Sequence, residues 1–457
     1  MDCHPLDWRW QGRKILTALS TACRAGCARQ CITPPLGVPL AGYFHERLAE
    51  YVRDDLYVRA VVVESGGERL ALISCDLIAP DRTLFDRTKA LIVAETGMAP
   101  ERVLICTTHT HTGPEIRPDH AMPVSAEWAA ELPRHIAATV AQAVASMFEA
   151  TLRPNRTEAE GYAFNRLFRQ RDGTEVFGRT DDEVGPAGPV DSELQTLSVV
   201  DEEGELRALL VHFALHVDVI GGGSANFISA DWPGELARNI AAVHGADVIT
   251  LFLQGTCGDI NHNAHGPTAL PRRGVPKAVQ LGRGLAGVAL HAAARAEPMA
   301  SAPLRSAETL LSIPYYTRDA AFMAELESLR AKEELSHFER YTLERGETWS
   351  HDGEVAQVPV QVLRLGEVAL VALPAEIFVR LGLEIKHFSP APSTFVVELA
   401  NADASTYVPT TDQAGRGAYG ARPILSRWLC ADAGRRLIDA AQVMLWELWQ
   451  ETGGKHE

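Results

Sequence analysis

The 457-residue sequence has no run of the ~18 uncharged apolar residues that a membrane span needs. Aromatic residues make up only 7%, and the 43 Lys and Arg are outnumbered by 59 Asp and Glu, for a net charge of −16. This shortage of positive charge argues against nucleic-acid binding, because duplex-binding proteins present a basic face. Apolar residues reach 46% and no long low-complexity run occurs, which excludes disorder. We expect a soluble globular protein.

Two enzyme motifs are also missing. The sequence contains no GxxxxGK[ST] phosphate loop and no GxSxG nucleophile elbow. A P-loop nucleotide hydrolase and a serine hydrolase therefore have no motif support.

The cysteines cluster at the N-terminus, where Cys23, Cys27 and Cys31 recur at four-residue spacing. On a helix this spacing would align the three thiols, but the pattern is a weak metal signal without a fourth ligand. Other cysteines lie in apolar runs that read as buried strands, which suits a reducing compartment. We therefore expect a cytoplasmic protein, with secretion and a periplasmic location left open. Residues 1–27 are expected to form a poorly ordered extension.

Strand-like and helix-like segments alternate along the chain, which favours an α/β or α+β domain with covered sheets. Apolar, β-branched runs predict strands at 57–65, 70–75, 102–107, 194–200, 207–213, 248–253, 359–365, 367–373 and 395–400. Apolar residues at three- and four-residue spacing predict helices near 81–96, 126–149, 233–244, 276–297, 318–335, 376–388 and 425–451. Segments 170–192 and 339–356 read as loops. No break in composition divides the rest, so we expect one large domain over 28–457.

The first candidate site is TTHTHTGP (107–114), directly after an apolar run. Residues two apart on extended chain point to the same side, so His109 and His111 can face one point. Neutral imidazole is a preferred zinc ligand. Alone, the motif is a weak signal, and two solvent-facing histidines in a polar loop account for it more often than a metal site does.

Two further candidates stand where apolar runs end. His216, in VHFALHVDVIGG, precedes a glycine turn that could lead into a site. Taken alone, a satisfied core histidine is the better interpretation of His216, and even more so of His212. Glu376, in LVALPAEIF, is expected at the start of a helix, where a carboxylate interacts with the positive helix end.

Two loop-like segments complete the candidates. Tyr407 and Tyr419 lie in ASTYVPTTDQAGRGAYGAR, where aromatic side chains either pack or hydrogen-bond a substrate. The segment QGTCGDIN (254–261) is a glycine turn after a predicted strand, a common place for exposed backbone N–H groups.

In this order, the fragments resemble the neutral ceramidase family of zinc-dependent amidases. The similarity starts near Ala28 with ARQCITPPLGVPLAGY and covers nearly the whole chain beyond residue 27. Its further segments are RDDLYVRAVVVE, LISCDL, TTHTHTGP, FNR, VDSELQ, HFALHV, ISADWPG, QGTCGDIN, LPAE and YVPTTDQAGRGAYG. The resemblance implies the α/β fold of the ceramidase catalytic domain, with mixed β-sheets packed between helical layers.

The resemblance also implies site residues. One Zn²⁺ per chain would have four ligands: His109, His216, Glu376 and Tyr407. His111 would carry a proton beside the metal, and Arg166 and Tyr419 would hold the carbonyl oxygen of the substrate. Asp231 and Asp259 are candidates for orienting the metal-bound histidines from behind.

The sequence departs from the family pattern at several points. Val217 replaces a proline after His216, Ala375 replaces a glycine before Glu376, and Gly255 stands where ceramidases carry serine. We also do not expect these 457 residues to include the immunoglobulin-like C-terminal domain of those enzymes. We therefore expect a smaller or more soluble amide than ceramide.

These inferences predict a zinc-dependent hydrolase that cleaves a linear amide, such as an N-acyl compound, with a metal-activated water. An ester or lactone hydrolase with the same zinc site is an alternative, and so is a catalytically silent binding protein of the same fold. The expected partner is a small-molecule amide, and the oligomeric state, homo-oligomer or monomer, is left open.

Overall fold

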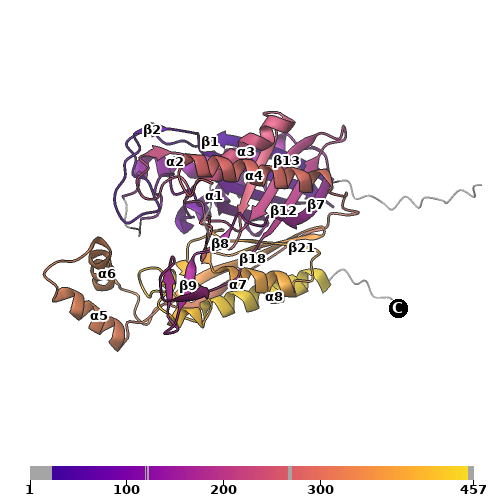
Figure 1. Cartoon of the computed structure of the whole chain (residues 1–457). Helices are drawn as coiled ribbons and strands as arrows, with labels where there is room; N and C mark the ends of the chain where they lie inside the picture. Colours follow the sequence, from indigo (N-terminus) through magenta and orange to yellow (C-terminus); the bar gives the residue numbers. More distant parts are fainter. Residues whose placement is uncertain (1–22, 119, 121–122, 266–269, 451–457) are drawn as a thin grey trace, which may run out of the picture.

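The computed structural model describes residues 23–118, 120, 123–265 and 270–450 (Figure 1). Of the expected N-terminal extension 1–27, residues 1–22 lie outside these ranges, whereas residues 23–27 belong to a paired strand and not to an extension. Two layers of β-sheet are enclosed by helices, with α1–α4 on one side and α7 and α8 on the other (Figure 1). The expected mixed α/β fold with sheets between helical layers is confirmed.

The first layer of sheet holds two groups of strands. One has the order β5-β4-β3-β1-β6 and the other β15-β13-β12-β7. Their bounds are β1 Cys23–Cys31, β3 Tyr57–Ser65, β4 Glu68–Cys75, β5 Val103–Thr107, β6 Phe148–Glu149, β7 Thr151–Glu158, β12 Glu193–Val200, β13 Leu206–Phe213 and β15 Ile249–Gln254. The covering helices are α1 Arg82–Thr96, α2 Ala126–Ala145, α3 Asp231–His244 and α4 Val275–Ala294.

The second layer has the order β17-β18-β19-β21. Its strands are β17 Leu304–Pro314, β18 Val355–Leu365, β19 Val368–Ala372 and β21 Ser393–Val397, covered by α7 Val379–Phe388 and α8 Ala433–Gln450. A continuous apolar core fills the space between the two layers, with Leu72, Leu253, Leu370 and Phe395 among its buried members. Burial of this interlayer core is what holds the sheets face to face.

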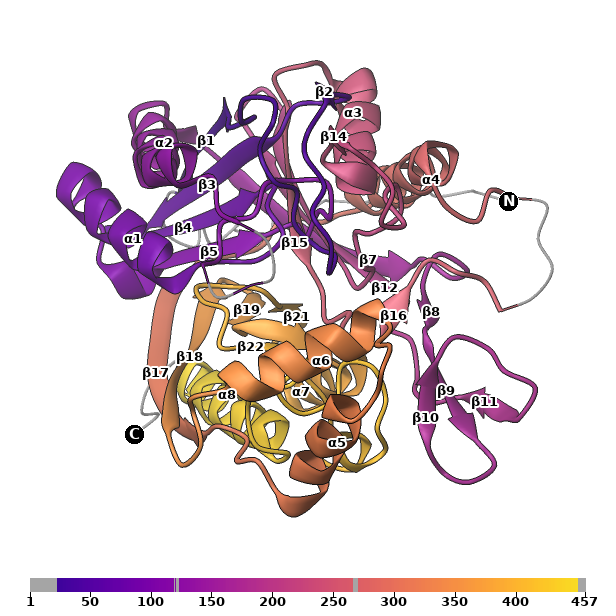
Figure 2. The ribbon, with the colours of Figure 1, turned by 90° about the vertical axis from the view of Figure 1, so that its left-hand side faces the viewer.

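Smaller elements surround the layers. They are β2 Tyr51–Val52, β8 Phe164–Asn165, β9 Leu167–Gln170, β10 Glu175–Phe177, β11 Glu183–Pro186, β14 Phe227–Ile228, β16 Ile260–Asn261, β20 Ala375–Ile377 and β22 Ser405–Val408. Helices α5 Ala320–Arg330 and α6 His337–Thr348 project together from the second layer (Figures 1 and 2).

Parallel strand pairs point their carboxyl ends toward one place. The pairs β4–β5, β13–β15 and β19–β21 are parallel. The chain after β21 joins the two layers there, because Glu398 N–H donates to Gln254 O at 3.0 Å and Asn401 N–H donates to Ile105 O at 2.8 Å. In sheets of this kind, ligand sites form at the carboxyl ends of strands. The candidate motifs follow these same ends.

Three local predictions are corrected. Cys23, Cys27 and Cys31 lie on strand β1, paired with β3, so a spacing of four residues separates successive thiols by about 13 Å and excludes a shared metal. The segment 339–356, predicted as loop, contains most of α6, which begins with a capping box between Ser336 and Glu339.

The third correction concerns the last two helices. Glu376 lies in strand β20 and α7 begins only at Val379, so the carboxylate is not in a first helical turn. Helix α8 begins at Ala433 rather than at residue 425. Within the described residues, no helix combines the length and the apolar character that a membrane crossing requires.

Candidate metal and catalytic site

The THTH segment leaves β5 in a turn rather than in an extended strand. His109 has a φ of 70°, a value that residues other than glycine adopt rarely. Its N–H donates to Leu77 O at 2.9 Å, and the N–H of His111 donates to Val217 O at 3.2 Å. The two imidazoles therefore converge because of this turn, with ring centroids 4.7 Å apart, and not because of strand alternation.

Backbone carbonyls fix the orientation of the imidazoles. His109 Nδ1 lies 2.7 Å from Ile78 O, and His111 Nδ1 lies 3.0 Å from Gly42 O. A carbonyl oxygen only accepts hydrogen bonds, so both Nδ1 atoms carry the proton and both Nε2 atoms present a lone pair. The Nδ1 of His216 faces Cys257 O at 3.5 Å.

The Nε2 atoms of the three histidines face one another. His109 Nε2 lies 3.0 Å from His216 Nε2 and 3.2 Å from His111 Nε2. Since Nδ1 of His109 and of His111 already carries the proton, their two Nε2 lone pairs cannot hydrogen-bond to each other. A cation between them would relieve this repulsion. All three rings are buried, and their nitrogen atoms lie within the 4.8 Å that a shared metal ion permits.

Glu376 completes the cluster. Its Oε2 lies 3.4 Å from His109 Nε2 and 3.9 Å from His216 Nε2. This Oε2 atom is buried and makes no hydrogen bond to a described residue. A buried carboxylate oxygen without a partner is costly. Imidazole nitrogen and carboxylate oxygen are both zinc ligands, so this donor set fits Zn²⁺.

Tyr407 and Glu376 are brought together by strand pairing. They are register partners in the parallel pair β22–β20. Burial and then the charge of Glu376 raise the pKa of the Tyr407 phenol well above its usual range. The structure thus places this expected ligand beside the carboxylate.

Arg166 lies against the tyrosines. Its Nη2 donates to Gly258 O at 2.8 Å and to Tyr407 Oη at 3.1 Å, and its guanidinium lies 5.4 Å from the centroid of the Tyr419 ring. Burial acts to lower the pKa of Arg166, but Tyr407, Tyr419 and the nearby carboxylates raise it by more, so it stays charged. Tyr419 lines the cavity directly, whereas Arg166 contacts it through the tyrosines.

Asp231 and Asp259 are bound to backbone and amide groups instead of imidazoles. Asp231 accepts the N–H groups of Ile220 and Trp232 at 2.9 and 2.6 Å. Asp259 accepts Val379 N–H at 2.7 Å and the Asn165 side-chain amide at 2.8 Å. The expected direct contact with the histidines is therefore not made, because the Nδ1 atoms of His109 and His111 are already bonded to carbonyls.

Two glycines are required by close packing at the site. A Cβ on Gly42 would lie 2.4 Å from His111 Nδ1, and its φ of 97° also disfavours any other residue. A Cβ on Gly255 would lie 2.8 Å from Ala214 N, so the serine that the family resemblance implies at this position has no space here without a backbone shift.

Sequence reasoning missed a buried carboxyl group behind the site. Glu398 is fully buried, and its Oε2 accepts Ile377 N–H at 2.7 Å and Cys257 N–H at 3.1 Å. It thereby connects the strand of Glu376 to the turn whose carbonyl faces His216. Burial raises the pKa of Glu398 well above its usual range, as does the charge of Glu376.

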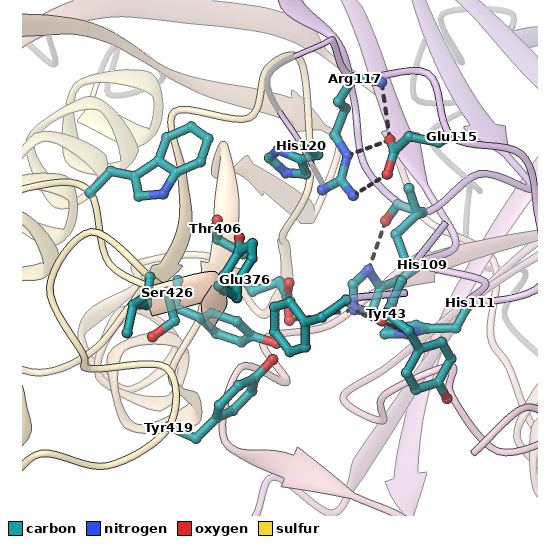
Figure 3. A pocket seen from close by; sticks show the side chains of 17 residues that line it. Tyr43, His109, His111, Glu115, Arg117, His120, Glu376, Thr406, Tyr419 and Ser426 are labelled. Atoms are coloured by element: carbon teal, nitrogen blue, oxygen red, sulfur yellow. Dashed lines mark hydrogen bonds and ion pairs between the residues drawn. The ribbon is translucent and has the colours of Figure 1, made fainter. Parts of the chain in front are cut away.

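The site opens into a cavity of about 80 Å³, seen in Figure 3. This is room for about half a dozen water-sized groups. His109, His111, Glu376, Tyr407 and Tyr419 line one side. Phe44 and Tyr341 of α6 also line it, with ring centroids 4.8 Å apart. No motif pointed to Phe44, and Tyr341 was missed because α6 was not expected.

Comparison with known proteins identifies the fold. The chain superimposes on the crystal structure of neutral ceramidase from Pseudomonas aeruginosa with a TM-score of 0.76, at 18% identity, over 94% of this chain and 75% of that one. A structure described as ceramidase complexed with C2 matches with a TM-score of 0.74 at 18% identity, over 94% and 76%. No family model and no curated protein sequence matches.

The chain therefore has a neutral ceramidase-like fold. The resemblance inferred from the ordered motifs is confirmed at the level of the three-dimensional structure.

Proposed function

We propose that this protein is a zinc-dependent hydrolase that cleaves a linear amide bond. The observation that carries the proposal is the convergence of the Nε2 atoms of His109, His111 and His216 beside the unpartnered Oε2 of Glu376. The ceramidase-like fold supports it, because it is shared with enzymes whose name denotes amide hydrolysis.

His109, His216, Glu376 and Tyr407 would hold the metal, with His111 beside it. When bound, zinc lowers the pKa of a coordinated water to ~7 and so supplies a hydroxide nucleophile at neutral pH. Burial and then the neighbouring His109 lower the pKa of His111 well below its usual range, so its Nε2 is an unprotonated acceptor. His111 would take the proton of the attacking water and deliver it to the leaving nitrogen.

Negative charge develops on the carbonyl oxygen during the attack. Burial raises the pKa of Tyr419 to about 12, so the phenol keeps its proton and can donate it in a hydrogen bond to that oxygen. Arg166 would polarise Tyr407 and Tyr419 from behind. Phe44 and Tyr341 would exclude water from the cavity.

The cavity favours a substrate smaller than ceramide. Its volume of about 80 Å³ would enclose the region around the scissile amide and a short flanking segment. The test is hydrolysis of matched short amides and esters by zinc-loaded protein, before and after removal of metal with a chelator. Amide cleavage that is lost on chelation and restored by zinc supports the proposal. Cleavage of esters alone would assign the alternative reaction, and cleavage that survives chelation would contradict the metal mechanism.

A further inference from the structure

The cavity has a second polar side, opposite the proposed metal site. Glu115, Arg117, His120 and Trp428 line it, and we refer to these four residues as the Arg117 wall. Figure 3 shows Arg117 and His120 across the cavity from Glu376 and Tyr419. Nothing in the hydrolytic chemistry requires a charged group at this position.

Arg117 is held rigidly. Its Nε and Nη2 donate to the two oxygens of Glu115 at 2.8 and 2.9 Å, and its Nη1 lies 3.4 Å from Asp403 Oδ2. A guanidinium has five N–H groups, so these contacts leave two of them for another partner. The side chain is 10% exposed, so the remaining donors face the cavity region and not bulk water.

The wall also contains polar atoms without partners. Trp428 Nε1 is buried and makes no hydrogen bond to a described residue. Neither ring nitrogen of His120 makes one either, although Nε2 has a carboxylate contact, with Asp403 Oδ2 3.5 Å away. An indole N–H can only donate, and a neutral imidazole supplies one further donor. Buried donors of this kind normally have an acceptor, which here would come from a bound molecule.

The two carboxylates near Arg117, those of Glu115 and Asp403, do not turn the Arg117 wall into a cation site. The Oε1 of Glu115 already accepts the N–H groups of Ile116 and Arg117 at 3.0 Å, in addition to the guanidinium. Asp403 lies behind the wall, and its Oδ2 is 3.5 Å from His120 Nε2. The face that remains toward the cavity is therefore one of donors.

Charge near the wall is balanced. Arg345 of α6 lies with its guanidinium 5.5 Å from the centroid of the Trp428 ring. Arg117 and Arg345 thus offset the two carboxylates, Glu115 and Asp403. An incoming anion would meet several hydrogen-bond donors at the wall, and the remaining negative charge is that of Glu376, which the proposed metal would offset.

We propose that the Arg117 wall binds a carboxylate of the substrate. The substrate class is then an amide that carries an acidic group near the scissile bond, such as an N-acyl amino acid or a half-amide of a dicarboxylic acid. This rests on the proposed amide hydrolysis at the metal site, and it excludes a neutral lipid amide as the preferred substrate. An arginine pre-oriented by a carboxylate is well suited to recognition of a planar anion.

The test uses amides that differ only in one charged group. On the amine side these are N-hexanoylglycine, N-hexanoylethanolamine and N-hexanoyl-ethylenediamine. On the acyl side they are N-butylsuccinamate, N-butyl-4-hydroxybutanamide and N-butyl-4-aminobutanamide. We expect kcat/KM for the anion to exceed that of its neutral counterpart at least tenfold in one series. Equal or better cleavage of the neutral or cationic amide in both series would overturn the proposal while leaving amide hydrolysis in place.

Measurements of substrate binding distinguish a failure of anion recognition from a failure of catalysis. Calorimetry with the anionic and neutral member of each series gives a readout that needs no turnover. Tighter binding of an anion without hydrolysis of any amide would support the Arg117 wall and contradict the proposed function. Equal binding of the anionic and neutral members in both series would overturn the proposal that the Arg117 wall binds a carboxylate.

Two variants test whether the preference for the anionic amide depends on Arg117 and Trp428. Arg117→Gln should reduce the ratio of anion to neutral kcat/KM at least tenfold, and Trp428→Phe, which removes only the N–H donor, should reduce it severalfold. Trp428→Phe keeps the proposal testable if Arg117→Gln fails to fold with Glu115 left unpaired. Arg134→Gln, in an exposed pair with Glu131 on α2, is the matched control and should keep the ratio of the parent. An unchanged ratio in the folded wall variants would overturn the proposal.

Discussion

His109 and His216 are 107 positions apart in the chain, yet their Nε2 atoms lie 3.0 Å from each other. The first follows β5 and the second follows β13, two strands from different groups of the same layer. Because the Nδ1 of His109 is bonded to Ile78 O, its Nε2 has no proton with which to bridge the gap.

His111→Gln tests whether His111 moves the proton or holds the metal. We expect the variant to retain metal and to lose turnover by a factor of about 10²–10⁴, the usual contribution of a general acid–base group. Metal content by elemental analysis and steady-state kinetics on the same preparation provide the measurement. Loss of the metal would instead make His111 a ligand.

Tyr419→Phe removes the donor proposed for the carbonyl oxygen. We expect kcat to fall by about 10²–10³, the effect of removing one such donor, while metal occupancy stays at the parental level. If the variant lost its metal, Tyr419 would have a structural or ligating role instead.

Glu398 offers a matched pair of substitutions. Burial and the charge of Glu376 raise the pKa of this carboxyl well above its usual range and so favour its neutral form, which Glu398→Gln should mimic. Glu398→Ala leaves the N–H groups of Ile377 and Cys257 unpaired, each at a cost of about 1–3 kcal/mol. Urea unfolding should show little change for glutamine and a large loss for alanine. Equal destabilisation by both would show that the carboxylate form is required.

The strands were largely predictable from sequence, and so was the place of the site along the chain. Runs such as YVRAVVVES and VITLFL are apolar and β-branched, and they form β3 and β15 within a residue or two of the expected limits. The THTH motif does follow a buried strand. These features depend on local pattern alone.

What the sequence could not reveal depends on contacts between distant segments. Glu376 reads as the start of a helix, but pairing of β20 with β22 keeps it in a strand opposite Tyr407. The convergence of His109 and His111 depends on the positive φ of His109, which hydrogen bonds to the chain after β4 stabilise. The Arg117 wall combines Arg117 with Trp428, more than 300 positions away, and no local motif marks that contact.

Helix α6 is a case in which a local signal was present. Ser336 and Glu339 form the S-x-x-E capping box, which marks a helix start. Its many charged residues obscured the apolar spacing, so the segment was interpreted as a loop. As a result the part of the cavity formed by Tyr341 was not foreseen.

The pH dependence of stability tests the interpretation of His212 as a core residue rather than a catalytic one. Its Nε2 donates to Val396 O at 3.0 Å, and burial lowers its pKa to about 3. The unfolded chain takes up this proton below pH ~6.5 and the folded chain only near pH 3, so stability is lost as the pH falls between these values. The loss from this group approaches ~1.4 kcal/mol per pH unit.

The parent is compared with His212→Gln, whose side-chain amide can still donate a hydrogen bond to Val396 O. The free energy of unfolding of the variant should fall less steeply than that of the parent between pH 6.5 and 4, as measured with urea. Parallel curves would show that His212 does not titrate in this way.

Metal content tests the central claim most directly. Chain purified without chelator and equilibrated with zinc should contain one zinc per chain by elemental analysis, and folded His109→Ala, verified by circular dichroism, should contain none. Absence of zinc from the parent chain, or one full equivalent in His109→Ala, would contradict the metal site on which the proposed hydrolase depends.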